Sequence, residues 1–294
     1  MRGGVELIRE VFGSDSDSDD ADELNHPGPS PPAPLMRPGC VVETPLGDGA
    51  RNPGMFVARE ALGEDARRWL LDSIRADDLV DFPDDEPSTA GSDRCAPTGG
   101  GRNQAMRFGR DHLPRWALAL ADAVAKLATT RPGVSKGVSL SPTASASASA
   151  ADDDDDAIFP REVLARALMP SGVFNQMIVN QYEPGEGLAP HVDLHAFADG
   201  VAVVSLRSTV VMDMYPPRGS SCCSSTPVWL RPGDVMFLSR AARWEWSHGI
   251  AARVADPAEG ETGPEGASWV RRGCRTSVTL RAMREDGHEL RVPA

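Results

Sequence analysis

The sequence lacks the features of secreted, zinc-binding and membrane-spanning proteins. Its five cysteines form no Cys-X-X-Cys pair and no even set, which argues against a disulfide framework. The first residues, MRGGVELIREVFGSDSDSDD, hold no apolar run like that of a signal peptide, and no later stretch is apolar over the length of a membrane span. We therefore expect a soluble protein without membrane association, located in the cytoplasm, the nucleus or both.

Lysine is also scarce, since Lys126 and Lys136 are the only two and arginine supplies almost all of the positive charge. The formal net charge is −13, but eleven negative charges belong to two acidic runs, at residues 15–23 and 152–156. The remainder of the chain is close to −2, and residues 201–284 carry eleven arginines against seven acidic residues. The acidic balance therefore does not exclude a polyanionic partner.

Composition divides the chain into a tail, a domain and an insertion. Residues 1–52 are acidic and then rich in proline, which predicts a disordered tail. Residues 53–294 are predicted to form one domain, interrupted at about 131–157 by a low-complexity insertion that reads SPTASASASAADDDDD in part. Apolar residues at helical spacing predict amphipathic helices near 59–75 and 113–128.

From residue 174 onward the apolar pattern changes to a period of two. Six short strands are predicted in FNQMIVNQY, VAVVSLRS, TVVMDMY, PVWL, VMFLS and CRTSVTLRA, separated by turns of glycine, proline and aspartate. Many short strands without long helices between them favour an antiparallel sandwich or open barrel. The predicted class is mainly β with flanking helices, an α+β protein.

Two histidines and one aspartate form a candidate metal site. His191 and Asp193 share one face of an extended segment, and His248 follows in EWSHGI. Two imidazoles and a carboxylate on one face of an ion are the ligand set of non-haem Fe(II) oxygenases. Taken singly, each residue is better explained by an ordinary core or surface role, and the metal site depends on the combination. His195 extends the pattern to His-X-Asp-X-His, but on a straight strand it would lie about 13 Å from His191, so we expect it outside the ligand set.

A strand with an arginine at each end forms a candidate anion site. Period two places Arg275, Ser277, Thr279 and Arg281 on one face, which is costly to bury unless an anion binds there. The alternative is a solvated face on an edge strand. Asn180 and Tyr182 share a face of an earlier strand, where they would hydrogen-bond an oxygen-rich ligand or simply cap the strand end.

Together, NQYEPGEGLAPHVDLHAF, WSHGI and RTSVTLR resemble the AlkB-like Fe(II)/2-oxoglutarate dioxygenases. The resemblance covers roughly residues 53–284, with the insertion outside it, and its wording is most similar to the eukaryotic branch that acts on wobble uridines of tRNA. It implies a double-stranded β-helix, or jelly roll, with Fe(II), 2-oxoglutarate and O2. It implies iron ligation by His191, Asp193 and His248. Arg275 would pair with the far carboxylate of 2-oxoglutarate, with Arg281, Asn180 and Tyr182 around the same molecule.

The implied activity is hydroxylation or oxidative demethylation of a nucleic-acid base, with tRNA or other RNA favoured. A protein side-chain hydroxylase or demethylase, a DNA alkylation-repair enzyme and a non-catalytic binding module remain alternatives. Relatives in the tRNA branch carry an RNA-recognition domain and a methyltransferase domain, for which this chain has no room. We therefore expect a monomer whose RNA recognition is supplied by a protein partner.

Overall fold

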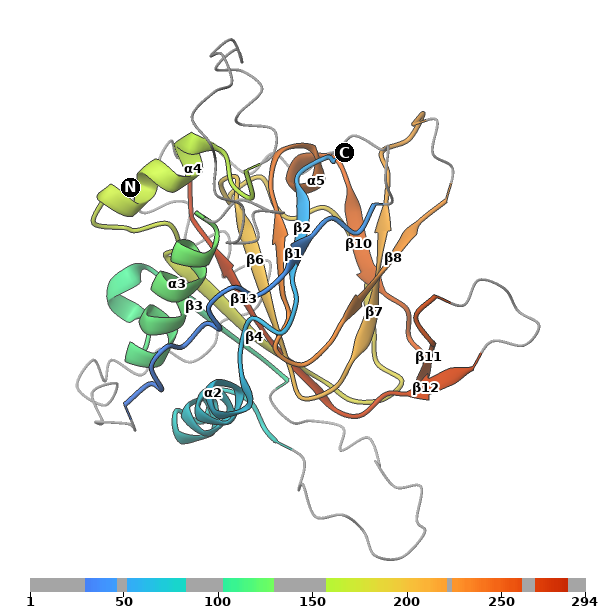
Figure 1. The fold of residues 1–294 in the computed structure, drawn as a ribbon, viewed down its shortest axis with the longest axis horizontal. Helices are drawn as coiled ribbons and strands as arrows, with labels where there is room; N and C mark the ends of the chain where they lie inside the picture. The colour runs from blue at the N-terminus through green and yellow to red at the C-terminus, as the bar shows by residue number, and fades with distance from the viewer. Residues whose placement is uncertain are drawn as a thin grey trace, which may run out of the picture.

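Two antiparallel sheets face each other, and helices cover the outer side of the larger one (Figure 1). The computed structural model describes residues 30–46, 52–82, 103–129, 157–220, 224–260 and 268–284. The larger sheet has the order β1 (Val42–Glu43), β2 (Met55–Ala58), β9 (Val235–Leu238), β6 (Val201–Leu206), β13 (Arg275–Arg281), β4 (Gln176–Tyr182) and β3 (Gln104–Phe108). The smaller has the order β5 (Leu188–His191), β10 (Ser247–Ile250), β7 (Val210–Tyr215) and β8 (Thr226–Leu230). A separate hairpin pairs β11 (Ala255–Pro257) with β12 (Trp269–Arg271). This is the jelly-roll architecture that the resemblance implied.

Two longer helices, α2 (Glu64–Ala76) and α3 (Arg115–Leu127), match the two predicted from apolar spacing. The first begins at Glu64 rather than near 59, because Met55–Ala58 forms a strand and Glu60 takes a left-handed φ of 47°. Short helical segments are α4 (Arg161–Ala165), α5 (Arg240–Trp244), η2 (Arg110–His112) and η3 (Arg166–Leu168). Within the described ranges, none of the helices has the length and apolarity needed to cross a membrane.

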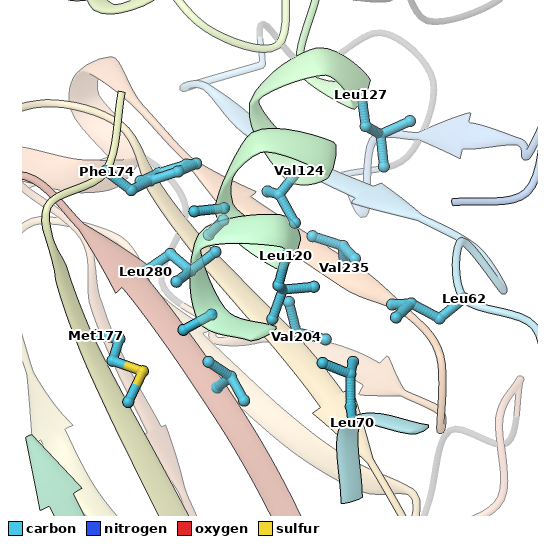
Figure 2. Packing of buried hydrophobic residues seen from close by; sticks show 14 of the residues in the cluster. Leu62, Leu70, Leu120, Val124, Leu127, Phe174, Met177, Val204, Val235 and Leu280 are labelled. Atoms are coloured by element: carbon cyan, nitrogen blue, oxygen red, sulfur yellow. The ribbon is translucent and has the colours of Figure 1, made fainter. Parts of the chain in front are cut away.

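The strands of the larger sheet bury both faces, in two separate cores. Val204, Val235 and Leu280 point to the helices, where Leu120 and Val124 of α3 pack on them (Figure 2). Residues of the same sheet with the opposite parity, such as Met236 on β9, pack against Met212 and other apolar side chains of the smaller sheet. Because alternate residues change face, the face of β13 opposite Leu280 looks into the space between the two sheets. Arg275 and Arg281 stand on that face.

All six predicted strand segments are strands, but the pattern missed β1, β2, β5, β10, β11 and β12. Strands β5 and β10 have only four residues each, and β5 contains a proline, which lowers a strand prediction. The part of the N-terminal tail that the structure describes also differs from the prediction of disorder. Leu35 is buried, the Arg37 amide donates to the Ala61 carbonyl, and β1 pairs with β2. The predicted insertion at 131–157 lies, apart from its last residue, outside the described residues.

Candidate active site

The structure brings His191, Asp193 and His248 together at one end of the smaller sheet. His191 is the last residue of β5, His248 is the second of β10, and the pairing of these strands sets the two opposite each other. Asp193 follows two residues after the end of β5. One ligand atom from each of the three side chains lies within 4.8 Å of the others. In the part of the chain that the structure describes, these are the residues grouped closely enough to hold a metal ion.

Glycine at position 249 allows β5 to approach β10 closely. A Cβ added there would lie 2.9 Å from the Leu188 carbonyl oxygen and 2.9 Å from the Pro190 nitrogen, closer than real Cβ atoms come to backbone. Any side chain at this position would therefore separate the two strands. Since Gly249 is the neighbour of His248 and lies across from the strand that carries His191, the spacing of the two imidazoles depends on it.

Both histidines are suited to bind a cation through a neutral ring. The Nδ1 of His191 lies 3.0 Å from the Ala189 carbonyl oxygen, so a proton placed on Nδ1 leaves Nε2 free. Burial, opposed by the charge of Asp193, lowers the pKa of His248 to about 4. The His248 imidazole is therefore neutral at neutral pH, and its Nδ1 is buried without a hydrogen-bond partner. Neutral imidazole is the form that ligates metals.

Asp193 is buried and ionised. Burial alone would raise the pKa of its carboxyl, but the charges of Arg281 and Arg243 outweigh burial and lower it. Arg281 donates to Asp193 Oδ1 at 2.6 Å, while Oδ2 is buried with no partner among the described residues. A carboxylate oxygen and an imidazole nitrogen without partners, both buried beside a third donor, are satisfied by a divalent cation. The donor set therefore fits Fe(II), which accepts two imidazoles and one carboxylate.

Arg275 is a buried cation whose charge no described residue neutralises. Its side chain donates to the Ser277 hydroxyl at 3.0 Å, but Nε and the second terminal nitrogen have no partner. Burial, reinforced by Arg272, lowers the pKa of Arg275 to about 10, so it remains charged at neutral pH. An unpaired buried charge costs several kcal/mol, roughly what the loss of one partner of a buried ion pair costs. A bound carboxylate would remove that cost.

A small pocket lies beside Arg275. Its lining includes Tyr182, Thr209, Ile250 and Arg272, together with Glu183 and Glu186. The carboxylate of Asp256 already neutralises Arg272, with hydrogen bonds of 2.6 and 2.7 Å, so Arg275 is the arginine in the lining that remains without a carboxylate partner among the described residues. Sequence reasoning missed Thr209, Ile250 and Arg272. Ile250 could have been found, because period two from His248 places it on the same face of β10.

The remaining predicted residues lie on the same inner face of the larger sheet. Tyr182 stands opposite Arg275, and the Arg275 guanidinium lies 5.5 Å from its ring centre. Asn180 stands opposite Ser277 and accepts a 2.6 Å hydrogen bond from Gln104. Arg281 lies at the metal end, on Asp193, six residues along β13 from Arg275. His195 lies outside the group, as predicted, with its ring 5.7 Å from that of Trp244.

Comparison with known proteins identifies the family of the chain. The family model of the 2OG-Fe(II) oxygenase superfamily matches residues 99–281. A tRNA (carboxymethyluridine(34)-5-O)-methyltransferase, alkbh8, from Xenopus tropicalis is 37% identical over 130 residues, which are 41% of this chain and 20% of that protein. An "alkylated DNA repair protein ALKBH8 homolog" from Arabidopsis thaliana is 29% identical over 135 residues, 40% of this chain and 37% of that protein.

The matched region is thus a fraction of these relatives' length, about a fifth for the amphibian protein. Among solved structures, that of OsALKBH1 aligns with 78% of this chain and 98% of its own, at 15% identity and a TM-score of 0.39. A family model that covers more than half of the chain, together with the ALKBH8 relatives, establishes membership. The chain belongs to the 2OG-Fe(II) oxygenase superfamily and is an AlkB-like, 2-oxoglutarate-dependent dioxygenase that uses Fe(II), 2-oxoglutarate and O2.

Proposed function

We propose that His191, Asp193 and His248 hold the iron and that Arg275 binds the far carboxylate of 2-oxoglutarate. The observation that carries the proposal is that two groups between the sheets each lack a partner among the described residues: the ligand cluster needs a cation, and the Arg275 guanidinium needs an anion. A cluster of cation ligands has unpartnered buried atoms at one end, and an unneutralised guanidinium lies beside a pocket at the other. One molecule with a carboxylate at each end, bound with a metal, completes both.

In this proposal the bound cofactors would supply oxidation chemistry: one atom of O2 enters succinate as 2-oxoglutarate loses carbon dioxide, and the other hydroxylates the substrate. The chain supplies position and charge. Arg281 holds the Asp193 carboxylate in place through a 2.6 Å hydrogen bond and keeps it ionised. The Ser277 hydroxyl accepts a hydrogen bond from the Arg275 guanidinium and so orients it. Val210 and Ile250 give the pocket an apolar wall beside the buried guanidinium of Arg275.

We further propose that the substrate is a base in RNA, with tRNA favoured. The support is the segment shared with proteins named as tRNA methyltransferases of carboxymethyluridine 34, together with the excess of arginine over acidic residues in 201–284. A base in a single-stranded loop can enter a pocket without being extracted from a duplex. Hydroxylation would leave an added oxygen, whereas hydroxylation of an N-methyl group would end in loss of formaldehyde.

Nucleoside mass spectrometry tests the substrate directly. Purified protein, Fe(II) and 2-oxoglutarate would be incubated with total tRNA, with messenger RNA and with a peptide pool, each with and without ascorbate. We expect a mass change in a tRNA nucleoside, accompanied by succinate. A change confined to peptides would replace RNA with a protein substrate. Binding of an anticodon-loop oligonucleotide should weaken steeply as salt rises, because phosphate contacts release counter-ions.

A further inference from the structure

Arg243 is among the most deeply buried side chains of the protein, yet it lies in a five-residue helix. It is the fourth residue of α5 and 1% exposed. Its guanidinium donates to the carbonyls of Asp193 at 3.1 Å, Leu194 at 2.7 Å and Phe197 at 2.8 Å, and more weakly to that of Ala198 at 3.4 Å. The loop that begins with Asp193 therefore bends around one side chain.

Arg243 pairs with carbonyl oxygens and not with a carboxylate in the described parts of the chain. Its buried guanidinium therefore holds the backbone of a loop in one conformation and forms no ion pair with any described residue. A guanidinium suits this task because its planar fork directs five N–H groups along fixed lines. The ammonium of a lysine would reach fewer of these carbonyls from the same backbone position. The arrangement therefore depends on arginine itself and not only on positive charge.

The same loop is tied to α5 a second time, at its far end. The carboxylate of Asp199 accepts hydrogen bonds from the Arg240 amide at 3.1 and 3.2 Å, where α5 begins. Trp244 packs on the other side, with its ring 4.2 Å from the Arg243 guanidinium. Four residues after Trp244, the chain reaches His248. Loop 193–199 and the approach to β10 are therefore joined as one unit, with Asp193 at one end and His248 at the other.

We propose that Arg243 is a positioning residue that holds Asp193 against His248 and thereby sets the affinity of the site for its metal. The inference rests on the proposed role of His191, Asp193 and His248 as ligands. Removing the Arg243 side chain would free the carbonyls of residues 193–198, and the loop would then carry the Asp193 carboxylate away from the imidazoles. Partners behind metal ligands contribute about 10- to 100-fold to affinity.

The metal affinity of the site can be measured by titrating the full chain with cobalt(II) in the absence of 2-oxoglutarate. The d–d absorption bands of the bound ion report both its amount and its coordination. The variants are Arg243→Lys and Arg243→Met. The matched control is Arg59→Lys, since Arg59 is also an enclosed arginine that donates to a backbone carbonyl, that of Trp229, and to Asp234, none of them in the triad. We expect Arg243→Lys and Arg243→Met to weaken cobalt binding about 10- to 100-fold and to alter the band shape. Arg59→Lys should bind as the native protein does, even where its melting temperature falls.

Native cobalt affinity and an unchanged spectrum in both Arg243 variants would overturn the inference. Should Arg243→Met fail to fold, Arg243→Lys decides the question, with the melting temperature of each variant recorded beside its affinity. Asp193→Ala separates this result from a failure of the proposed function. If that variant binds cobalt as tightly as the native chain, the triad is not the metal site. If it loses binding while the Arg243 variants keep it, only the role of Arg243 is wrong.

Discussion

Each of the three oxygen atoms of Asp193 has a different role in the proposed site. One carboxylate oxygen accepts from Arg281, the other is free for a cation, and the backbone carbonyl accepts from Arg243. A residue of similar size without both carboxylate oxygens would therefore lose the hydrogen bond from Arg281, the ligand atom for the cation, or both. The same holds for Arg275, whose fork meets Ser277 on one nitrogen and leaves two for a ligand.

Replacing Asp193 with alanine should abolish succinate production. The substitution removes one of three metal donors and leaves Arg281 without its buried partner, so iron would be held weakly. Succinate release in the presence of Fe(II), 2-oxoglutarate and O2 is the measurement. His195→Ala serves as the control, because His195 is exposed and outside the group. Undiminished turnover in Asp193→Ala would show that iron binds elsewhere.

Arg275→Ala should raise the KM for 2-oxoglutarate by roughly 10- to 100-fold, the equivalent of about 1.5–3 kcal/mol for hydrogen bonds to a charged group. Arg275→Lys keeps the positive charge but loses the planar guanidinium, so its KM for 2-oxoglutarate should lie between those of the native protein and Arg275→Ala. The measurement is succinate formed as a function of 2-oxoglutarate concentration. Arg271→Ala, an exposed arginine of β12, is the comparison and should leave the KM unchanged. A native KM in Arg275→Ala would assign the pocket to another ligand.

Sequence patterns could identify these side chains, but they could not tell whether each is buried or which charged residue it pairs with. Period two placed Arg275 and Arg281 on one face, and it paired His191 with Asp193. It left open whether the arginine face was solvated, because burial depends on which strands lie beside β13. Among the described residues, Asp256 pairs with Arg272 while no carboxylate pairs with Arg275, and this difference is a consequence of the tertiary fold. For the same reason nothing in the sequence distinguished Arg243 from its neighbours.

At the scale of elements, the site depends on the pairing of β5 and β10. Both are short, yet each carries one of the two imidazoles, and β5 lies at the edge of its sheet. Their close approach relies on Gly249, where a side chain would meet Leu188 and Pro190. The larger sheet provides a fixed wall opposite them, since β6, β9 and β13 are buried on both faces.

Gly249→Ala should weaken metal binding more than it lowers the melting temperature. The added methyl group would push β5 from β10 and separate His191 from His248, while the cores on either side of the larger sheet stay intact. Cobalt affinity and thermal unfolding would be measured in parallel. Gly63→Ala is the control, because the nearest atom to an added Cβ there is the Arg37 side chain at 3.4 Å. Equal cobalt affinity in Gly249→Ala and native protein would argue against this dependence.

The elements that sequence analysis found are those with several alternating residues, as in β4, β6, β7 and β13. β5 and β10 have four residues each and contain Pro190 and Gly249, whereas the equally short β9 is a continuous apolar run that follows a Pro-Gly-Asp turn. β2 is an apolar run directly before a helical pattern, and periodicity alone does not separate such a run from the helix. The two imidazoles of the proposed metal site thus lie on strands that the apolar pattern missed, and it was the residue motif that indicated them.

At the scale of the whole molecule, part of the N-terminal tail belongs to the fold. Its composition predicted disorder, but Leu35 joins the helix-side core and Glu43 pairs with Arg59 at 2.6 Å. Composition could not reveal this, because a few anchoring residues suffice when the surface that receives them is already built. The domain therefore begins earlier than the boundary near 52 that the sequence indicated.

Deleting residues 1–52 should lower the melting temperature relative to deleting residues 1–29. The longer deletion exposes the surface under Leu35 and leaves β2 at the sheet edge. Burial of one leucine contributes about 1.5–3 kcal/mol, which corresponds to roughly 3–12 °C in a domain of this size. Differential scanning calorimetry of the two truncated chains is the measurement. Identical melting temperatures would show that residues 30–46 add nothing to stability.

On the proposed assignment, binding of 2-oxoglutarate by the unneutralised charge of Arg275 would couple the two cofactors to each other. A dianion that settles on this arginine with its other end at the metal would make the iron harder to remove, and by thermodynamic reciprocity the iron must tighten the dianion by the same factor. The apoprotein is then a poor receptor for either one alone. Its occupancy would rise and fall as a joint response to cellular iron and to the supply of a central-metabolism keto acid.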